Sequence, residues 1–192
     1  LSNSNYIFTK SIDNLIIKEK DLTLNIFKKL NSHIVLCQRN SGIWGVNDIN
    51  KIIINQTDSY DFLKLDEGIP IMCTENNEEL GISNGDIGVL IGKDKHRRFL
   101  FRKFNKFNNF VAALIEPDKL ANIVPALAIT IHKSQGSEAK KVSILWNQKN
   151  DFDETMINDY FPEIFFRNNF DKRLLYTGIT RARENLDIYY LK

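Results

Sequence analysis

The chain has 192 residues, of which 43% are apolar and 26% are charged. This composition is typical of a globular protein and excludes an intrinsically disordered one, and the length suffices for one sizeable domain or two small ones. The formal net charge of +2 is too small to indicate binding to nucleic acid or to a membrane by itself. Any site for a polyanion must therefore be local.

The two cysteines, Cys37 and Cys73, each lie in an apolar run and have neither the number typical of a disulfide scaffold nor the spacing of a zinc site. They are most simply core residues of a protein in a reducing compartment, the cytoplasm. No apolar run approaches about 18 residues, so neither membrane spanning nor export is predicted. The chain begins with Leu1 and its first methionine is Met72, so we expect a piece of a longer protein.

The first third of the chain predicts the beginning of an α/β domain. Residues 1–30 are polar and end in LTLNIFKKL, whose apolar residues recur at helical spacing. HIVLCQRN predicts a buried strand, and GVNDINKIIINQ predicts a helix with Val46, Ile49 and Ile53 on one side. A strand followed by a helix is the unit of a parallel α/β sheet.

From about Gly68 the pattern changes to short apolar runs separated by turn residues, namely IPIMCTE, IGVLIGK, FLFRKF and FVAALIEP. Strands this short and closely spaced predict a small antiparallel barrel at residues 67–122. Within it, residues 97–110 interleave five phenylalanines with basic residues. Such a run could stack nucleic-acid bases, but a hairpin with apolar residues inward and charged residues outward explains it as well and is favoured.

The stretch ALAITIHKSQGSE, residues 126–138, begins as a buried strand and then becomes polar within seven residues. KVSILW follows as another buried strand, so the polar run connects two strands at the edge of an α/β sheet. Ligands of such sheets bind where strands end and loops begin. The polar and aromatic residues 147–170 predict only a helical or irregular insertion.

Near the C-terminus, DKRLLYTGITRAREN predicts a helix, and LDIYYL predicts a closing strand. One face of the helix would be apolar, with Leu174, Leu175, Ile179 and Ala182. On the other side, Thr177 and Arg181 are four residues apart and would share a surface.

The chain contains no GxxxxGK[ST] phosphate loop, and its acidic pairs do not follow apolar strands as those of a magnesium-binding Walker B segment do. It should therefore not bind ATP alone in the usual way. The remaining possibility is that it completes a phosphate site across an interface, with Arg181 or Arg39 stabilising charge on a transferring phosphoryl group. Taken alone, these arginines are better explained as surface charges in salt bridges.

Three segments resemble motifs of one family, in the order of that family. VLCQRNSGIWGVNDIN, AITIHKSQGSE and LLYTGITRARENL are similar to motifs IV, V and VI of superfamily 1 helicases of the RecD type, in the 5′ to 3′ branch. The resemblance implies an α/β fold, in which a RecA-like parallel-sheet domain of the P-loop NTPase type carries an inserted SH3-like β-barrel. The lead-in segment would be residues 1–30, the second RecA-like domain 31–66 and 123–192, and the barrel 67–122.

The resemblance also implies roles for individual residues. Arg181 matches the motif VI arginine that contacts the γ-phosphate of ATP, and Arg39 matches the motif IV arginine that shares this task. The motif V positions that face the nucleotide are Gln135, Gly136 and Glu138.

Four further positions lie near the backbone of the single strand in the family. Hydroxyl, imidazole, ammonium and amide groups there can bind phosphates. In this sequence they are Thr130, His132, Lys133 and Ser134.

The function that the resemblance implies is the C-terminal half of an ATP-dependent 5′ to 3′ DNA helicase. It would resemble the exodeoxyribonuclease V alpha subunit and act in DNA double-strand-break repair and recombination. ATP with Mg²⁺ would be bound mainly by a preceding RecA-like domain that this sequence lacks, so the chain alone should not hydrolyse ATP. The other expected partners are single-stranded and double-stranded DNA and subunits of the RecB and RecC type.

Two other functions stay open. A motor domain that has lost its role could serve as a non-catalytic DNA-binding or scaffold module. Taken alone, His132 could be a structural residue of a turn, but within TxHxSQGxE the functional interpretation is favoured. A nuclease is disfavoured because no carboxylate cluster has the spacing of a metal site, and no metal ligand is predicted. A phosphate loop upstream of this sequence would distinguish the helicase from the scaffold.

Overall fold

The computed structural model of the chain describes residues 20–55, 60–104, 110–147 and 169–191. These residues form two compact units. The parallel unit comprises residues 31–53 and 128–191, and the antiparallel unit comprises residues 20–30 and 54–127. The expected insertion at residues 147–170 lies almost entirely outside the described residues, as do residues 1–19 of the expected lead-in segment. In the part of the chain that is described, no helix is long and apolar enough to cross a membrane.

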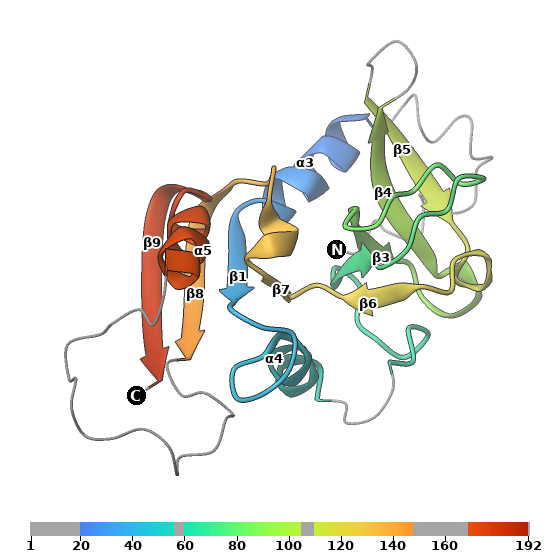
Figure 1. Ribbon diagram of the computed structural model, residues 1–192. Helices are drawn as coiled ribbons and strands as arrows, with labels where there is room; N and C mark the ends of the chain where they lie inside the picture. Colours follow the sequence, from blue (N-terminus) through green and yellow to red (C-terminus); the bar gives the residue numbers. More distant parts are fainter. Residues whose placement is uncertain (1–19, 56–59, 105–109, 148–168, 192) are drawn as a thin grey trace, which may run out of the picture. The chain divides into compact units, whose positions relative to one another are not determined.

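The parallel unit contains a four-stranded sheet in the order β7-β1-β8-β9, in which every neighbouring pair is parallel (Figure 1). This sheet confirms the predicted α/β class. Its strands are β1 (His33–Cys37), β7 (Ala128–Thr130), β8 (Ala139–Asn147) and β9 (Ala182–Leu191).

One face of this sheet is covered by helix α5 (Asn169–Ile179) (Figure 1). The alternation of β8 directs Val142, Ile144 and Trp146 to this face, where all three are buried. A Cβ atom on Gly178 would lie only 3.0 Å from Cδ1 of Ile144. The helix therefore lies close to the sheet because residue 178 has no side chain.

The opposite face is covered at one end by helix α4 (Val46–Ile54), whose Val46 and Ile49 pack near Cys37. The prediction that Ile53 shares this inward face is wrong, since its side chain is 53% exposed. Asn50 faces inward instead and is 2% exposed. Its side-chain amide donates to the carbonyl of Ala128 at 3.0 Å, and its oxygen accepts from the Ala128 N–H at 2.9 Å. Asn50 thus satisfies the backbone of the edge strand β7 as a further strand would.

The antiparallel unit contains a five-stranded sheet in the order β5-β4-β3-β2-β6. Four of its strands were predicted, but β6 was not, because it has three residues and lies beyond the predicted boundary at residue 122. Within the described ranges no pairing joins β5 to β6, so the structure shows an antiparallel sheet, and its closure into an SH3-like barrel stays a prediction. The strands are β2 (Pro70–Cys73), β3 (Ile87–Ile91), β4 (Arg98–Phe104), β5 (Phe110–Ile115) and β6 (Ile123–Pro125).

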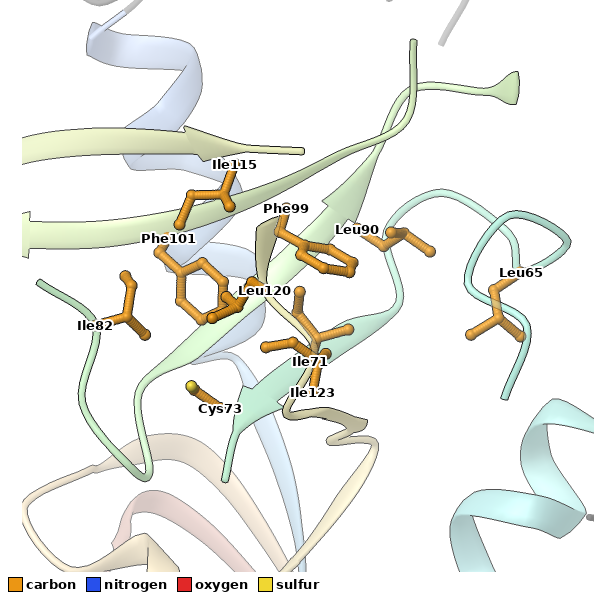
Figure 2. Close-up of a cluster of buried hydrophobic side chains, with 10 residues drawn as sticks. All are labelled: Leu65, Ile71, Cys73, Ile82, Leu90, Phe99, Phe101, Ile115, Leu120 and Ile123. Carbon is orange, nitrogen blue, oxygen red and sulfur yellow. The ribbon is translucent and has the colours of Figure 1, made fainter. Parts of the chain in front are cut away.

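The core of the antiparallel unit contains Phe99 and Phe101 of β4, which are 1% and 0% exposed (Figure 2). Leu100 between them faces the other side of the sheet, where it packs with Phe27 of helix α3 (Lys20–Leu30). The burial of both phenylalanines confirms the hairpin interpretation for these two residues and excludes them from stacking on bases. Residues 105–109, at the tip of the hairpin, lie outside the described residues.

Arg97, at the start of this hairpin, is not an outward charge as the alternation predicted. Arg97 is 4% exposed, and its Nη2 donates to the carbonyls of Leu63 and Leu65 at 3.0 and 2.6 Å. These hydrogen bonds hold the segment that contains Leu63 and Leu65 against the start of β4. Charge-assisted bonds of this kind are roughly twice as strong as neutral ones.

The C-terminal helix ends earlier than its sequence pattern predicted. α5 stops at Ile179, and β9 already begins at Ala182, so Ala182 is not on the apolar face of a helix. The reason is strand pairing, because Ala182 pairs with Ala139 at the start of β8. Arg181 consequently lies in the turn between helix and strand, where its N–H donates to the carbonyl of Gly178 at 3.1 Å.

Truncating Phe101 tests the core of the antiparallel unit. Phe101→Ala should lower the free energy of unfolding by roughly 3–5 kcal/mol, because it removes a fully buried ring and leaves a cavity. Urea unfolding followed by circular dichroism measures the loss. The exposed Lys93, replaced by alanine, is the control and should change the free energy by less than about 0.5 kcal/mol. Equal midpoints for the two variants would contradict this packing.

Replacing Asn50 tests the polar contact with the edge strand. Asn50→Leu should cost roughly 1–3 kcal/mol for each of the two Ala128 backbone groups that lose a partner. Both tryptophans of the chain, Trp44 and Trp146, lie in the parallel unit, so their fluorescence during urea unfolding reports on this unit. Asn47→Leu, on the exposed side of α4, is the matched control. A loss no larger than that of the control would show that Asn50 does not hold β7.

Candidate functional site

The carboxyl ends of β1 and β7 lie side by side at one edge of the parallel sheet. Cys37 and Thr130, their last residues, are in register, and the N–H of Ile131 donates to the carbonyl of Cys37 at 3.0 Å. The chain leaves both strands at this edge with polar residues, Arg39 after β1 and His132 after β7. The resemblance implies different roles for these two residues, with Arg39 on ATP and His132 on DNA, but the strand pairing places both at the same edge.

A single 3-10 turn, η3 (His132–Ser134), follows β7. Ser134 is 0% exposed and its hydroxyl donates to the carbonyl of Ile131 at 2.7 Å, while the Thr130 hydroxyl accepts from the N–H of Lys133 at 3.3 Å. Thr130 is also buried. Both hydroxyls therefore stabilise the turn in this structure, whereas the side chains of His132 and Lys133 are exposed.

Beyond the turn, the chain continues as an exposed segment toward β8. Gly136 has a φ of +82°, a left-handed conformation that is costly for residues with a Cβ, although a Cβ here would meet nothing within 4 Å. The backbone conformation, and not a lack of space for a side chain, therefore explains the glycine at position 136. Gln135 and Glu138 on either side are exposed, so their polar groups are accessible to a ligand.

Arg181 binds this segment from the other side. Its Nη1 donates to the carbonyl of Ser137 at 3.4 Å, its Nε to the carbonyl of Thr177 at 3.1 Å, and its Nη2 to the Thr180 hydroxyl at 3.1 Å. All of these acceptors are neutral oxygens. In the described part of the chain the guanidinium has no carboxylate partner, so its charge can still be neutralised by an anion such as a phosphate.

The predicted site residues thus form two groups at opposite ends of β8. The first group follows the ends of β1 and β7, at the level where Cys37 pairs with Leu145 of β8, and contains Arg39, Thr130, His132, Lys133 and Ser134. The second group lies at the start of β8, next to the pairing of Ala139 with Ala182, and contains Arg181 and Glu138. Leu145 and Ala139 are six residues apart on one strand, or about 20 Å at ~3.3 Å per residue. The structure does not bring Arg39 and Arg181 together.

Arg183 was missed by the sequence analysis. Its Nε donates to Oε2 of Glu138 at 2.6 Å. Arg183 and Glu138 are 45 positions apart in the sequence, so only the register of β8 and β9 shows that they are partners. Asn50 was missed for a similar reason, because an asparagine within a helical pattern is usually exposed.

Two titratable groups of β1 have shifted pKa values. Burial raises the pKa of the Cys37 thiol to about 12, so it stays protonated and is not a nucleophile near neutral pH. Burial, and to a lesser extent the charge of Lys141, lower the pKa of His33, although Asp187 opposes this shift. His33 Nε2 lies 3.0 Å from the Ser143 hydroxyl at the amino end of β1, away from the polar edge.

The described residues include no cluster of three or more His, Cys, Asp or Glu side chains that could hold a metal ion. The arginine side chains of the site carry positive charge and fit an anionic group, such as the phosphates of a nucleotide.

No model of a known protein family matches the chain. In sequence it is 34% identical to the RecBCD enzyme subunit RecD of Buchnera aphidicola subsp. Schizaphis graminum over 199 aligned residues, which is 99% of this chain and 29% of that protein. It is 32% identical to the RecBCD enzyme subunit RecD of Buchnera aphidicola subsp. Acyrthosiphon pisum, over 98% of this chain and 31% of that protein. The chain thus spans less than a third of the length of these curated relatives.

Among solved structures, the crystal structure of Bacteroides Pif1 bound to ssDNA aligns with a TM-score of 0.46 at 18% identity, over 84% of this chain and 42% of that one. The family is identified by the sequence similarity to RecD. The chain therefore belongs to the RecD family and corresponds to part of the length of the RecD subunit.

Proposed function

We propose that the chain is the second motor domain, with its inserted antiparallel unit, of an ATP-dependent 5′ to 3′ DNA helicase. The observation that carries the proposal is the similarity to RecD over 99% of the chain. The whole protein would act in DNA double-strand-break repair and recombination, with subunits of the RecB and RecC type as partners. The inserted unit would be the SH3-like barrel of such an enzyme.

In this proposal ATP and Mg²⁺ bind mainly to a preceding RecA-like domain. Closure of the two motor domains would bring Arg181 onto the γ-phosphate, where a guanidinium stabilises the charge that develops during transfer. Gln135, Gly136 and Glu138 would border the nucleotide. What supports this placement is that Arg181 contacts the carbonyl of Ser137, within the same segment, and has only neutral partners.

The single strand would bind at the other group of residues. His132 and Lys133 are exposed and would contact phosphates directly, while the buried Thr130 and Ser134 would shape the turn that presents these two side chains. Arg39, predicted to share the γ-phosphate with Arg181, follows β1 at the same edge as this turn. Its position favours a contact with the nucleic acid instead.

Movement would follow from alternation between these two groups. ATP binding and hydrolysis would change the closure of the motor domains, and the turn after β7 would hold and release the strand in step. The segment of residues 131–138 joins the two groups, so it would couple nucleotide state to grip on DNA.

Removing the proposed γ-phosphate arginine tests the assignment. In the full-length protein, Arg181→Ala should leave ATP binding intact but lower DNA-stimulated ATP hydrolysis by at least roughly 100-fold, because a charge that acts mainly in the transition state is lost. Steady-state hydrolysis and equilibrium nucleotide binding measure the two effects. Arg173→Ala, an exposed arginine of α5, is the matched control and should retain activity. Unchanged turnover in the Arg181 variant would refute the role.

A further inference from the structure

Glu138 and Arg183 form a short ion pair across the beginnings of β8 and β9. Arg183 Nε lies 2.6 Å from Glu138 Oε2, and the two side chains are 67% and 47% exposed. An exposed pair of this kind contributes little to stability. The main effect of this ion pair is therefore on the charged side chains next to it.

The neighbouring charge is Arg181, the proposed γ-phosphate arginine. Its carbonyl accepts from the N–H of Ala139, and its Nη1 donates to the carbonyl of Ser137. Both of these bonds are to residues directly adjacent to Glu138. Two arginines, Arg181 and Arg183, thus bind the same three-residue stretch, but only Arg183 binds the carboxylate in it.

A carboxylate next to an arginine forms a strong charge-assisted bond, often to two nitrogens at once. If Glu138 bound Arg181, that guanidinium would be neutralised by the protein and would have to break this pair before it could bind a phosphate. Arg183 prevents the competition by occupying the carboxylate. The backbone bonds that define the start of β8 do not depend on the pair, since they run through Ala139 and Arg181.

We propose that Arg183 is a positioning residue, which keeps Glu138 occupied and thereby leaves Arg181 available to an anionic ligand. The proposal rests on the proposed role of Arg181. If the ion pair were only structural, removing the charge of Glu138 would not restore activity to a variant that lacks Arg183. In the proposed role, the loss of activity is caused by the unpaired Glu138 carboxylate and should disappear when Glu138 loses its charge.

The test is a rescue experiment in the full-length protein. Arg183→Gln should lower kcat of DNA-stimulated ATP hydrolysis roughly fivefold, the upper range for a partly exposed ion pair that must be broken. The double variant Arg183→Gln with Glu138→Gln should return kcat to within about twofold of Glu138→Gln alone, because no carboxylate is left to bind Arg181. KM for ATP is measured in parallel, since loss of a contact made by Glu138 itself would raise KM in both variants that carry Glu138→Gln.

The chain offers a matched control in the adjacent ion pair. Lys140 Nζ and Glu184 Oε1 join the same two strands at 3.5 Å and are similarly exposed. Glu184→Gln should leave kcat unchanged. Undiminished kcat in Arg183→Gln, or a loss that Glu138→Gln does not restore, would overturn the proposal.

A second readout separates failure of this inference from failure of the proposed function. In the nitrogen-15-labelled full-length protein, the side-chain Nε–H resonance of Arg181 should shift in Arg183→Gln relative to the wild type, and Glu138→Gln added to that variant should abolish the shift. No such shift in the variant would overturn the inference even if the protein hydrolyses ATP. A shift without any ATPase activity in the wild type would support the inference and reject the helicase.

Discussion

Residues 131–138 must carry the chain from the carboxyl end of β7 to the amino end of β8, and the candidate site depends on this constraint. The two strands are parallel and β1 lies between them, so the segment has to cross β1 and also return about 20 Å along the sheet. Eight residues span at most roughly 26–29 Å when fully extended, and a dozen or more are usual for a parallel crossover. Three of the eight are used in the turn η3. The segment is therefore nearly taut.

A taut segment explains how its residues are used. The buried hydroxyl of Ser134 closes the turn at one end, the left-handed Gly136 redirects the backbone, and Arg181 fixes the carbonyl of Ser137 at the other end. The side chain of Ile131 lies beside Gly178, whose missing Cβ lets α5 approach. One segment with fixed ends gives the proposed coupling a physical basis, because a shift at either end cannot be absorbed by slack in the chain.

Much of this arrangement could be predicted from sequence, because its signals are local. The apolar runs of β1, β8 and β4 and the helical periodicity of α4 placed these elements, and the polar run after Thr130 pointed to the right edge of the sheet. What could not be predicted depends on pairing between distant residues. The contacts of Asn50 with Ala128, the early end of α5 at Ile179 and the pairing of Arg183 with Glu138 are set by strand register. β6 is too short to leave a pattern.

We propose that this chain supplies half of a split ATPase site. ATP hydrolysis measured with and without single-stranded DNA, on the 192-residue chain and on the full-length protein side by side, tests it most directly. We expect a silent chain and a DNA-stimulated full-length protein. Hydrolysis by the chain alone would contradict the proposal that Arg181 only completes a site built elsewhere. Silence of both would assign the chain to a non-catalytic scaffold.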